Sequence, residues 1–149
     1  MLKIDDLRVH LDADAGLVRA IDGMRLTLAQ GQTFALVGES GCGKTTTAKM
    51  ILRSVTPDKG EIIFDDGGMP RDVLALEGNE LFAYRRKVQF VFQDPFSSLN
   101  PRMTVYDIVS EPLVIHRIGN EDERFARVKE LIGLVGLDVR HLRRYPHSF

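Results

Sequence analysis

Gly38-Glu39-Ser40-Gly41-Cys42-Gly43-Lys44-Thr45 is the stretch that decides the fold of this chain. It fits the phosphate-binding loop pattern G-x-x-x-x-G-K-[ST] at every fixed position. The apolar run 33–37 before it predicts a buried strand, and residues 45–53 after it predict a helix. This order of strand, loop and helix is the context in which the pattern binds a nucleotide triphosphate.

The residue types of the loop explain how phosphate is held. Glycine at 38, 41 and 43 lets the backbone turn so that its N–H groups surround an anion at a helix N-terminus. We expect Lys44 to reach the β- and γ-phosphates and Thr45 to place its hydroxyl on Mg²⁺. The predicted phosphate-binding residues are Gly38, Glu39, Ser40, Gly41, Cys42, Gly43, Lys44, Thr45 and Thr46. The alternative is a glycine-rich turn with a solvated lysine.

Composition describes an ordinary globular chain. It has 149 residues, 44% of them hydrophobic and 28% charged, which is enough for one domain with a sizeable core. A net charge of −1 gives no sign of bulk attraction to nucleic acid. No apolar run approaches the roughly 18 residues that span a membrane, and no signal-peptide pattern is present. The single cysteine, Cys42, suits a reducing compartment, so we expect a cytoplasmic protein.

The remaining elements follow from periodicity and turn residues. Strands are predicted at 2–11, 17–21, 24–28, 61–64 and 88–92, and a helix at 80–87. Thr104 and Asp107 resemble a capping box that opens a helix to about residue 117. Asn120 is predicted to cap a second helix with one apolar face, formed by Phe125, Val128, Leu131, Ile132 and Val135. His116 and His141 lack metal-ligand spacing and are interpreted as surface or packing residues.

A second motif narrows the family. This motif resembles the glutamine loop of ATP-binding cassette (ABC) transporter ATPases and reads Val91-Phe92-Gln93-Asp94-Pro95-Phe96-Ser97-Ser98-Leu99-Asn100-Pro101. Its sequence is most similar to that of the oligopeptide/dipeptide importer subgroup. Residues 20–24, 36–44 and 144–149 resemble the same subgroup, in one collinear order over the whole chain.

This resemblance implies an α/β fold: a P-loop NTPase core with an N-terminal antiparallel β-subdomain and the start of a helical subdomain. Residues 1–149 would be a partial ATP-binding domain, with the β-subdomain and core portion at 1–95 and the glutamine-loop and helical portion at 96–149. The resemblance implies that the chain binds ATP and Mg²⁺. It further implies that Gln93 and Lys44 take part in catalysis and that Gln93 and Thr45 bind the metal ion. A second ATPase subunit and transmembrane permease subunits are the implied partners. The permease would dock at roughly 94–108, which would hold the chain on the inner face of the cell membrane.

The sequence departs from the family in two places. The family has an aromatic residue that stacks on adenine in the first strand region, where this chain offers His10 and Leu11. The family's signature motif, its second phosphate-site strand with the catalytic glutamate and its switch histidine would follow Phe149. The chain therefore resembles an N-terminal fragment, and we expect it to bind ATP with little turnover. Residues 33–37 would then lack sheet neighbours and expose apolar surface.

Three functions stay open at this point. The first is an ATPase subunit that couples hydrolysis to import of peptides or similar solutes, and the second is a nucleotide-binding module without hydrolysis. The third is a small phosphoryl-transfer enzyme of another phosphate-loop class, in which Asp94 would organise Mg²⁺. The sequence does not identify a transported substrate or distinguish a homodimer from a heterodimer.

Overall fold

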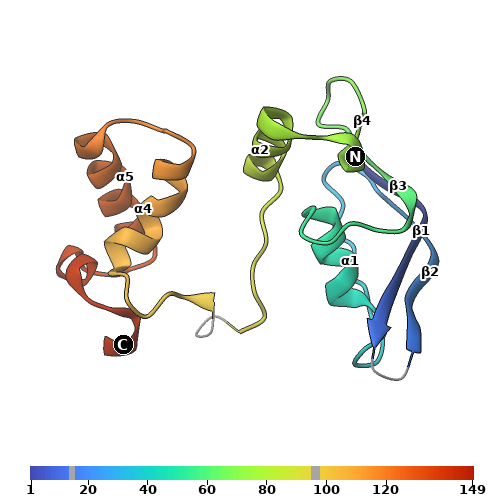
Figure 1. The fold of residues 1–149 in the computed structure, drawn as a ribbon. Coiled ribbons are helices and arrows are strands. Elements are labelled where there is room, and N and C mark those ends of the chain that lie inside the picture. The colour runs from blue at the N-terminus through green and yellow to red at the C-terminus, as the bar shows by residue number, and fades with distance from the viewer. Residues whose placement is uncertain (14–15, 95–97) are drawn as a thin grey trace. The chain divides into compact units, whose positions relative to one another are not determined.

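The computed structural model describes residues 1–13, 16–94 and 98–149, and gives the backbone alone for 11–13 and 16–18. The chain forms two compact units, residues 1–90 and 91–149 (Figure 1). The predicted division at 95/96 falls on residues 95–97, which lie outside the described residues.

The first unit is built on an antiparallel sheet. Its strands are β1 (Leu2–Ala13), β2 (Gly16–Leu28), β3 (Lys59–Phe64) and β4 (Arg71–Asp72), in the order β2-β1-β3-β4. The two strands predicted at 17–21 and 24–28 are one strand, β2. Gly23 sits inside it at φ +78°, where β1 and β2 also change register. A bulge of this kind bends a strand without ending it, which is why the sequence pattern looked interrupted.

One face of the sheet packs against two helices, α1 (Lys44–Ile51) and α2 (Gly78–Lys87). The buried residues of this core are Ile4, Leu7, Val9, Ile21, Met50, Ile62, Val73, Leu76 and Tyr84. Val73 lies in the 3₁₀ helix η1 (Val73–Ala75), which Asp72 caps through the N–H of Leu74. The helices predicted around 45–53 and 80–87 are confirmed, each within a few residues of its predicted bounds.

Two predicted strands are wrong. Residues 33–37 and 88–92 are not strands, and Val37 and Val91 are 89% and 91% exposed. A strand is held by hydrogen bonds to a neighbouring strand, and no strand among the described residues lies beside either segment. The apolar residues of both segments favour a strand, but a segment becomes a strand only when a neighbouring strand pairs with it.

The second unit is helical. Its elements are α4 (Val105–Ile115), α5 (Glu121–Leu134) and the 3₁₀ helices η2 (Val139–Arg143) and η3 (Pro146–Ser148). Capping boxes open both α helices, Thr104 with Asp107 and Asn120 with Glu123. The first box and the Asn120 cap are as the sequence predicts, and the part of Glu123 is added by the structure. Within the part of the chain that is described, every helix is too short or too polar to cross a membrane.

The core of the second unit uses only part of the predicted apolar face of α5. Val128 and Ile132 are buried with Leu142 of η2. Phe125 and Val135 are 47% and 69% exposed, although they share the predicted helical face. Val135 is the C-cap residue of α5, where the helical face ends. Phe125 instead lies against Tyr106 of α4, with ring centroids 5.7 Å apart.

Candidate phosphate-binding site

The phosphate-loop motif runs into α1, whose first two residues are Lys44 and Thr45. Gly43 is the N-cap residue of α1 at φ +94°, a left-handed conformation that glycine adopts at low cost. A Cβ at this position would lie 2.8 Å from the carbonyl oxygen of Ala20 and 3.0 Å from Cγ1 of Ile21. The loop is therefore packed against β2, and only a residue without a side chain fits there.

Thr47 fastens the first turn of α1 to the same strand. Its buried hydroxyl donates to the carbonyl oxygen of Gly43 at 3.0 Å and lies 3.4 Å from Sδ of Met24. The amide of Thr47 also donates to Gly43 at 2.8 Å. The helix N-terminus, with its unsatisfied N–H groups and positive dipole end, is thus fixed in place beside β2.

Lys44 closes the loop on itself. Its ammonium donates to the carbonyl oxygens of Gly38 at 2.7 Å and Glu39 at 2.5 Å, and lies 3.4 Å from Sγ of Cys42. All three contacts are exposed to solvent. A phosphate would have to draw the ammonium away from the two carbonyl oxygens, and as an ionised acceptor it makes the stronger hydrogen bond.

The rest of the loop has the openness that an anion needs. A Cβ built on Gly41 meets nothing within 4 Å, whereas one on Gly38 would lie 2.6 Å from Sγ of Cys42. Residues 38–42 are exposed, as is Thr45 at the start of α1, whereas Thr46 is half-buried. Because Thr45 is exposed in the first turn of α1, its side chain is accessible to a ligand at the loop, and its role on Mg²⁺ stays a prediction.

An open hollow of about 310 Å³ lies beside the loop. Its walls come from β2, from residues 36–37, from the loop and from α1: Ala20, Ile21, Asp22, Met24, Leu36, Val37, Cys42, Gly43, Lys44 and Thr47. Its volume is at the lower end of the range for small-molecule sites. We call it the loop hollow.

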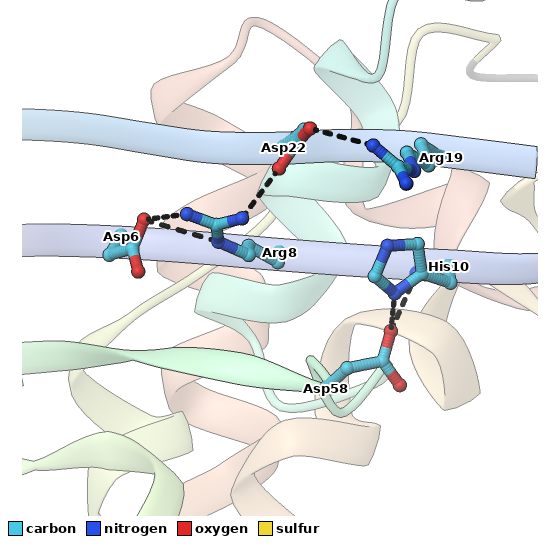
Figure 2. Close-up of polar contacts among 6 residues, drawn as sticks. All are labelled: Asp6, Arg8, His10, Arg19, Asp22 and Asp58. Carbon is cyan, nitrogen blue, oxygen red and sulfur yellow. Dashed lines mark hydrogen bonds and ion pairs between the residues drawn. The ribbon is translucent and has the colours of Figure 1, made fainter.

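Asp22, at the wall of the loop hollow, belongs to a network of ion pairs (Figure 2). Arg8 of β1 reaches Asp22 at 3.0 Å and Asp6 at 2.9 Å, and Arg19 of β2 lies 3.7 Å from Asp22. The hydrogen bond from Arg8 holds the pKa of Asp6 below its usual range. Sequence reasoning missed this network, because its members come from two strands that the sequence does not show to be paired.

Of the two predicted adenine residues, one is described in full. His10 lies near the end of β1, and its backbone N–H and its Nδ1 lie 2.6 and 3.0 Å from Oδ2 of Asp58. The side chain of Leu11 lies outside the described residues. Asp58 was not predicted, because 48 residues separate it from His10.

Gln93 is exposed and belongs to the second unit, as does Asp94. The structure thus brings together the loop residues, Thr45 and Lys44, while the relation of Gln93 to them stays a prediction. Among the described residues, no group of three or more His, Cys, Asp or Glu side chains is arranged to hold a metal ion.

Comparison with known proteins identifies the family. The model of the ABC transporter family (ABC_tran) matches residues 21–149. The oligopeptide transport ATP-binding protein OppF of Bacillus subtilis is 42% identical over 150 residues, which cover all of this chain and 48% of that protein. OppF of Streptococcus mutans is 46% identical over 136 residues, or 91% of this chain and 43% of that protein. The chain spans about half the length of these relatives.

Solved structures agree with this result. The dimeric ATP-binding cassette MJ0796, in a post-hydrolysis state with ADP and Pi, has a TM-score of 0.82 at 27% identity. The match covers all of this chain and 63% of that one. CbiO1 from Clostridium perfringens, part of the transporter complex cbiONQ, has a TM-score of 0.72 at 25% identity, with 99% and 55% coverage. The sheet, the phosphate loop and the helical unit described above are therefore parts of an α/β ATP-binding cassette, and this chain belongs to the ABC transporter family.

Proposed function

We propose that this chain is the ATP-binding part of a transport ATPase that couples ATP binding and hydrolysis to the import of peptides or similar solutes. The observation that carries the proposal is the phosphate loop itself, held against β2 by Gly43 and Thr47 at the N-terminus of α1. The peptide-transport names of relatives at 42 and 46% identity support the substrate class.

Within this proposal each loop residue has a chemical role. The backbone N–H groups of 38–46 surround the phosphates, Lys44 binds the β- and γ-phosphates, and Thr45 donates an oxygen to Mg²⁺. Bound Mg²⁺ would neutralise charge that develops on the phosphate oxygens. Gln93 would act on the attacking water and the metal, and His10 with Leu11 would contact the base.

The proposed partners follow from the same reasoning. MJ0796 forms a dimer, which supports pairing of this chain with a second ATPase subunit. Permease subunits would dock at about 94–108, a range that includes the start of α4. Such docking would place the protein on the inner face of the cell membrane.

Mg-ATP binding and phosphate release by this chain test the proposal, with Lys44→Ala as the matched variant. Loss of the charged contact is expected to weaken ATP binding about ten- to a hundredfold. Equal affinity in the two proteins would refute the phosphate site. Release of phosphate that depends on Lys44 would show hydrolysis by this chain, whereas lysine-dependent binding without release would favour a nucleotide-binding module.

A further inference from the structure

We propose that the helical second unit binds a short zwitterionic peptide in an open groove formed by α4, α5 and η2. The groove has a volume of about 640 Å³, and all of its lining residues lie between Thr104 and Arg143. We call it the α4–α5 groove. It shares no lining residue with the loop hollow beside the phosphate loop, so the inference goes beyond the proposed function and does not depend on it.

Part of the groove lining is apolar and exposed. The ring of Phe125 lies against that of Tyr106, yet the side chain of Phe125 stays 47% exposed, and Val139 of η2 is 37% exposed. Leu142, which also lines the groove, is buried in the core of the second unit. Covering exposed apolar surface is favourable, so an apolar side chain of a ligand would bind against Phe125 and Val139.

Two carboxylates contribute to the lining, from Glu121 and Asp122 in the first turn of α5. Negative charge at a helix N-terminus stabilises the helix, but this effect does not occupy the carboxylate oxygens. Both side chains are exposed, and neither makes a hydrogen bond or an ion pair with another residue of the described chain. A primary ammonium has three donors and no acceptor, so two free carboxylates suit the N-terminus of a peptide.

The opposite charge in the groove comes from η2. Arg140 lies 3.3 Å from Asp138, so a neighbouring carboxylate already compensates its charge. Arg143 also lines the groove, and its guanidinium has no hydrogen bond or ion pair to any residue that the structure describes. A guanidinium holds a carboxylate through two parallel hydrogen bonds. Arg143 therefore suits the C-terminal carboxylate of a peptide.

The acidic and the basic side chains of the groove do not pair with each other. Within the described residues, neither Glu121 nor Asp122 lies within ion-pair distance of Arg143. Opposite charges that line one groove without meeting leave space for a ligand with a complementary charge at each end. A peptide with free termini has both charges at neutral pH. The groove volume is in the middle of the range for small-molecule sites, and a single amino acid would fill only part of it.

The test is an NMR titration of the ¹⁵N-labelled chain with the tripeptide Ala-Leu-Ala at about pH 7. Chemical-shift changes are expected at the backbone amides of the groove residues. N-acetylation and C-terminal amidation of the peptide are each expected to weaken binding about tenfold, because each removes one charged contact. Free leucine is expected to bind about tenfold more weakly than the tripeptide, because its two charges lie too close together to reach both sets of side chains.

Arg143→Gln tests which residue binds the carboxylate. The variant is expected to bind Ala-Leu-Ala about tenfold more weakly than the wild type and to bind the amidated peptide equally well, since only the carboxylate contact is lost. Arg127→Gln is the matched control, because Arg127 is an exposed arginine of the same unit that pairs with Glu130 and does not line the groove. Its peptide affinity is expected to equal that of the wild type.

The double variant Glu121→Gln, Asp122→Asn tests the ammonium contact in the same way. It is expected to lose about tenfold in affinity for the free peptide and to bind the acetylated peptide as the wild type does. Because it also removes charge from the N-terminus of α5, thermal unfolding is measured beside the titration to show that the second unit is folded.

The other outcomes would overturn the inference. Equal affinities for the free, acetylated and amidated peptides would show that the charges do not select the ligand. Leucine that binds as tightly as the tripeptide would exclude peptides as the ligand class. Shifts at the groove that grow with protein concentration and not with peptide would assign the groove to a second copy of the chain. Mg-ATP binding that depends on Lys44, measured on the same samples, tests the proposed function separately from the groove.

Discussion

The ammonium of Lys44 donates to the carbonyl oxygen of Gly38 at 2.7 Å, so a hydrogen bond joins the lysine of the phosphate-loop motif to the first glycine of the same motif. This contact is exposed. Under the proposed function, a bound phosphate would replace the carbonyl oxygen as the acceptor of the lysine. The loop is thus held in a closed form by the same residue that is proposed to bind the ligand.

Lys44→Ala is therefore expected to lower ATP affinity while leaving the free energy of unfolding almost unchanged. The lysine contacts are exposed, and exposed polar contacts of this kind contribute little, so the free energy of unfolding should change by about 0.5 kcal/mol or less. ATP affinity should nevertheless fall by the ten- to hundredfold expected for a charged contact. Urea denaturation beside calorimetric titration measures both. A large loss of stability with proportionate loss of affinity would indicate that Lys44 is mainly structural.

Gly43→Ala is expected to damage the loop and the fold together. The new Cβ would lie 2.8 Å from the carbonyl oxygen of Ala20, and the residue would keep a left-handed backbone at φ +94°. A clash with backbone and a strained φ together are expected to cost about 1–3 kcal/mol. Gly41→Ala is the matched control, because it shares the positive φ at +85° but meets nothing within 4 Å. Equal destabilisation in the two variants would show that the backbone angle alone matters.

Local sequence signals predicted the start of α1 after Gly43 and the N-caps of α4 and α5 correctly, because these features depend on neighbouring residues. The Thr104–Asp107 pair is three residues apart, and the loop glycines act within one turn of chain. The segments 33–37 and 88–92 were predicted wrongly for the opposite reason, since a strand exists only beside a hydrogen-bonding neighbour. The His10–Asp58 pair could not be predicted either, because the register of β1 with β3 brings the turn before Lys59 next to β1.

Cys42 gives a chemical probe of the loop. Its thiol is exposed, lies 3.4 Å from Nζ of Lys44 and stands in the segment that would surround phosphate. Alkylation at Cys42 is expected to block ATP binding by filling the loop, and bound Mg-ATP is expected to slow the alkylation. Mass spectrometry of the single cysteine follows the rate with and without ATP. Cys42→Ser provides the unreactive control, and equal rates in both conditions would place the thiol outside the ligand's reach.

The two apolar segments 33–37 and 88–92, which pair with no strand among the described residues, are expected to make the chain associate. Val37 and Val91 are 89% and 91% exposed, and Phe92 is 60% exposed. Exposed apolar segments with high strand propensity pair with other chains. Val37→Asp is therefore expected to lower the average mass measured by light scattering as protein concentration rises. Met69→Asp changes a residue that is 80% exposed in a polar turn and serves as control. A monomeric wild type over the whole concentration range would contradict the prediction.

Ionisation of Tyr84 is expected to lower the stability of the first unit at alkaline pH. Its side chain is buried, its hydroxyl donates to the carbonyl oxygen of Ile51 at 2.6 Å, and burial raises its pKa from 10.0 to about 12. An acid whose pKa is higher in the folded than in the unfolded state contributes its full stability below the unfolded pKa. That contribution is lost as pH rises from about 10 to about 12, because the unfolded chain releases the proton first.

The free energy of unfolding is accordingly expected to fall by about 2–3 kcal/mol over this interval, since one pKa unit corresponds to about 1.4 kcal/mol. Tyr84→Phe removes the titrating group and is expected to remove this part of the slope, while costing about 1 kcal/mol at neutral pH through the unpaired carbonyl oxygen of Ile51. Urea denaturation of both proteins at several pH values separates this term from the titration of lysines, which the two proteins share. Parallel slopes in the two proteins would show that Tyr84 ionises no later in the folded state than in the unfolded chain.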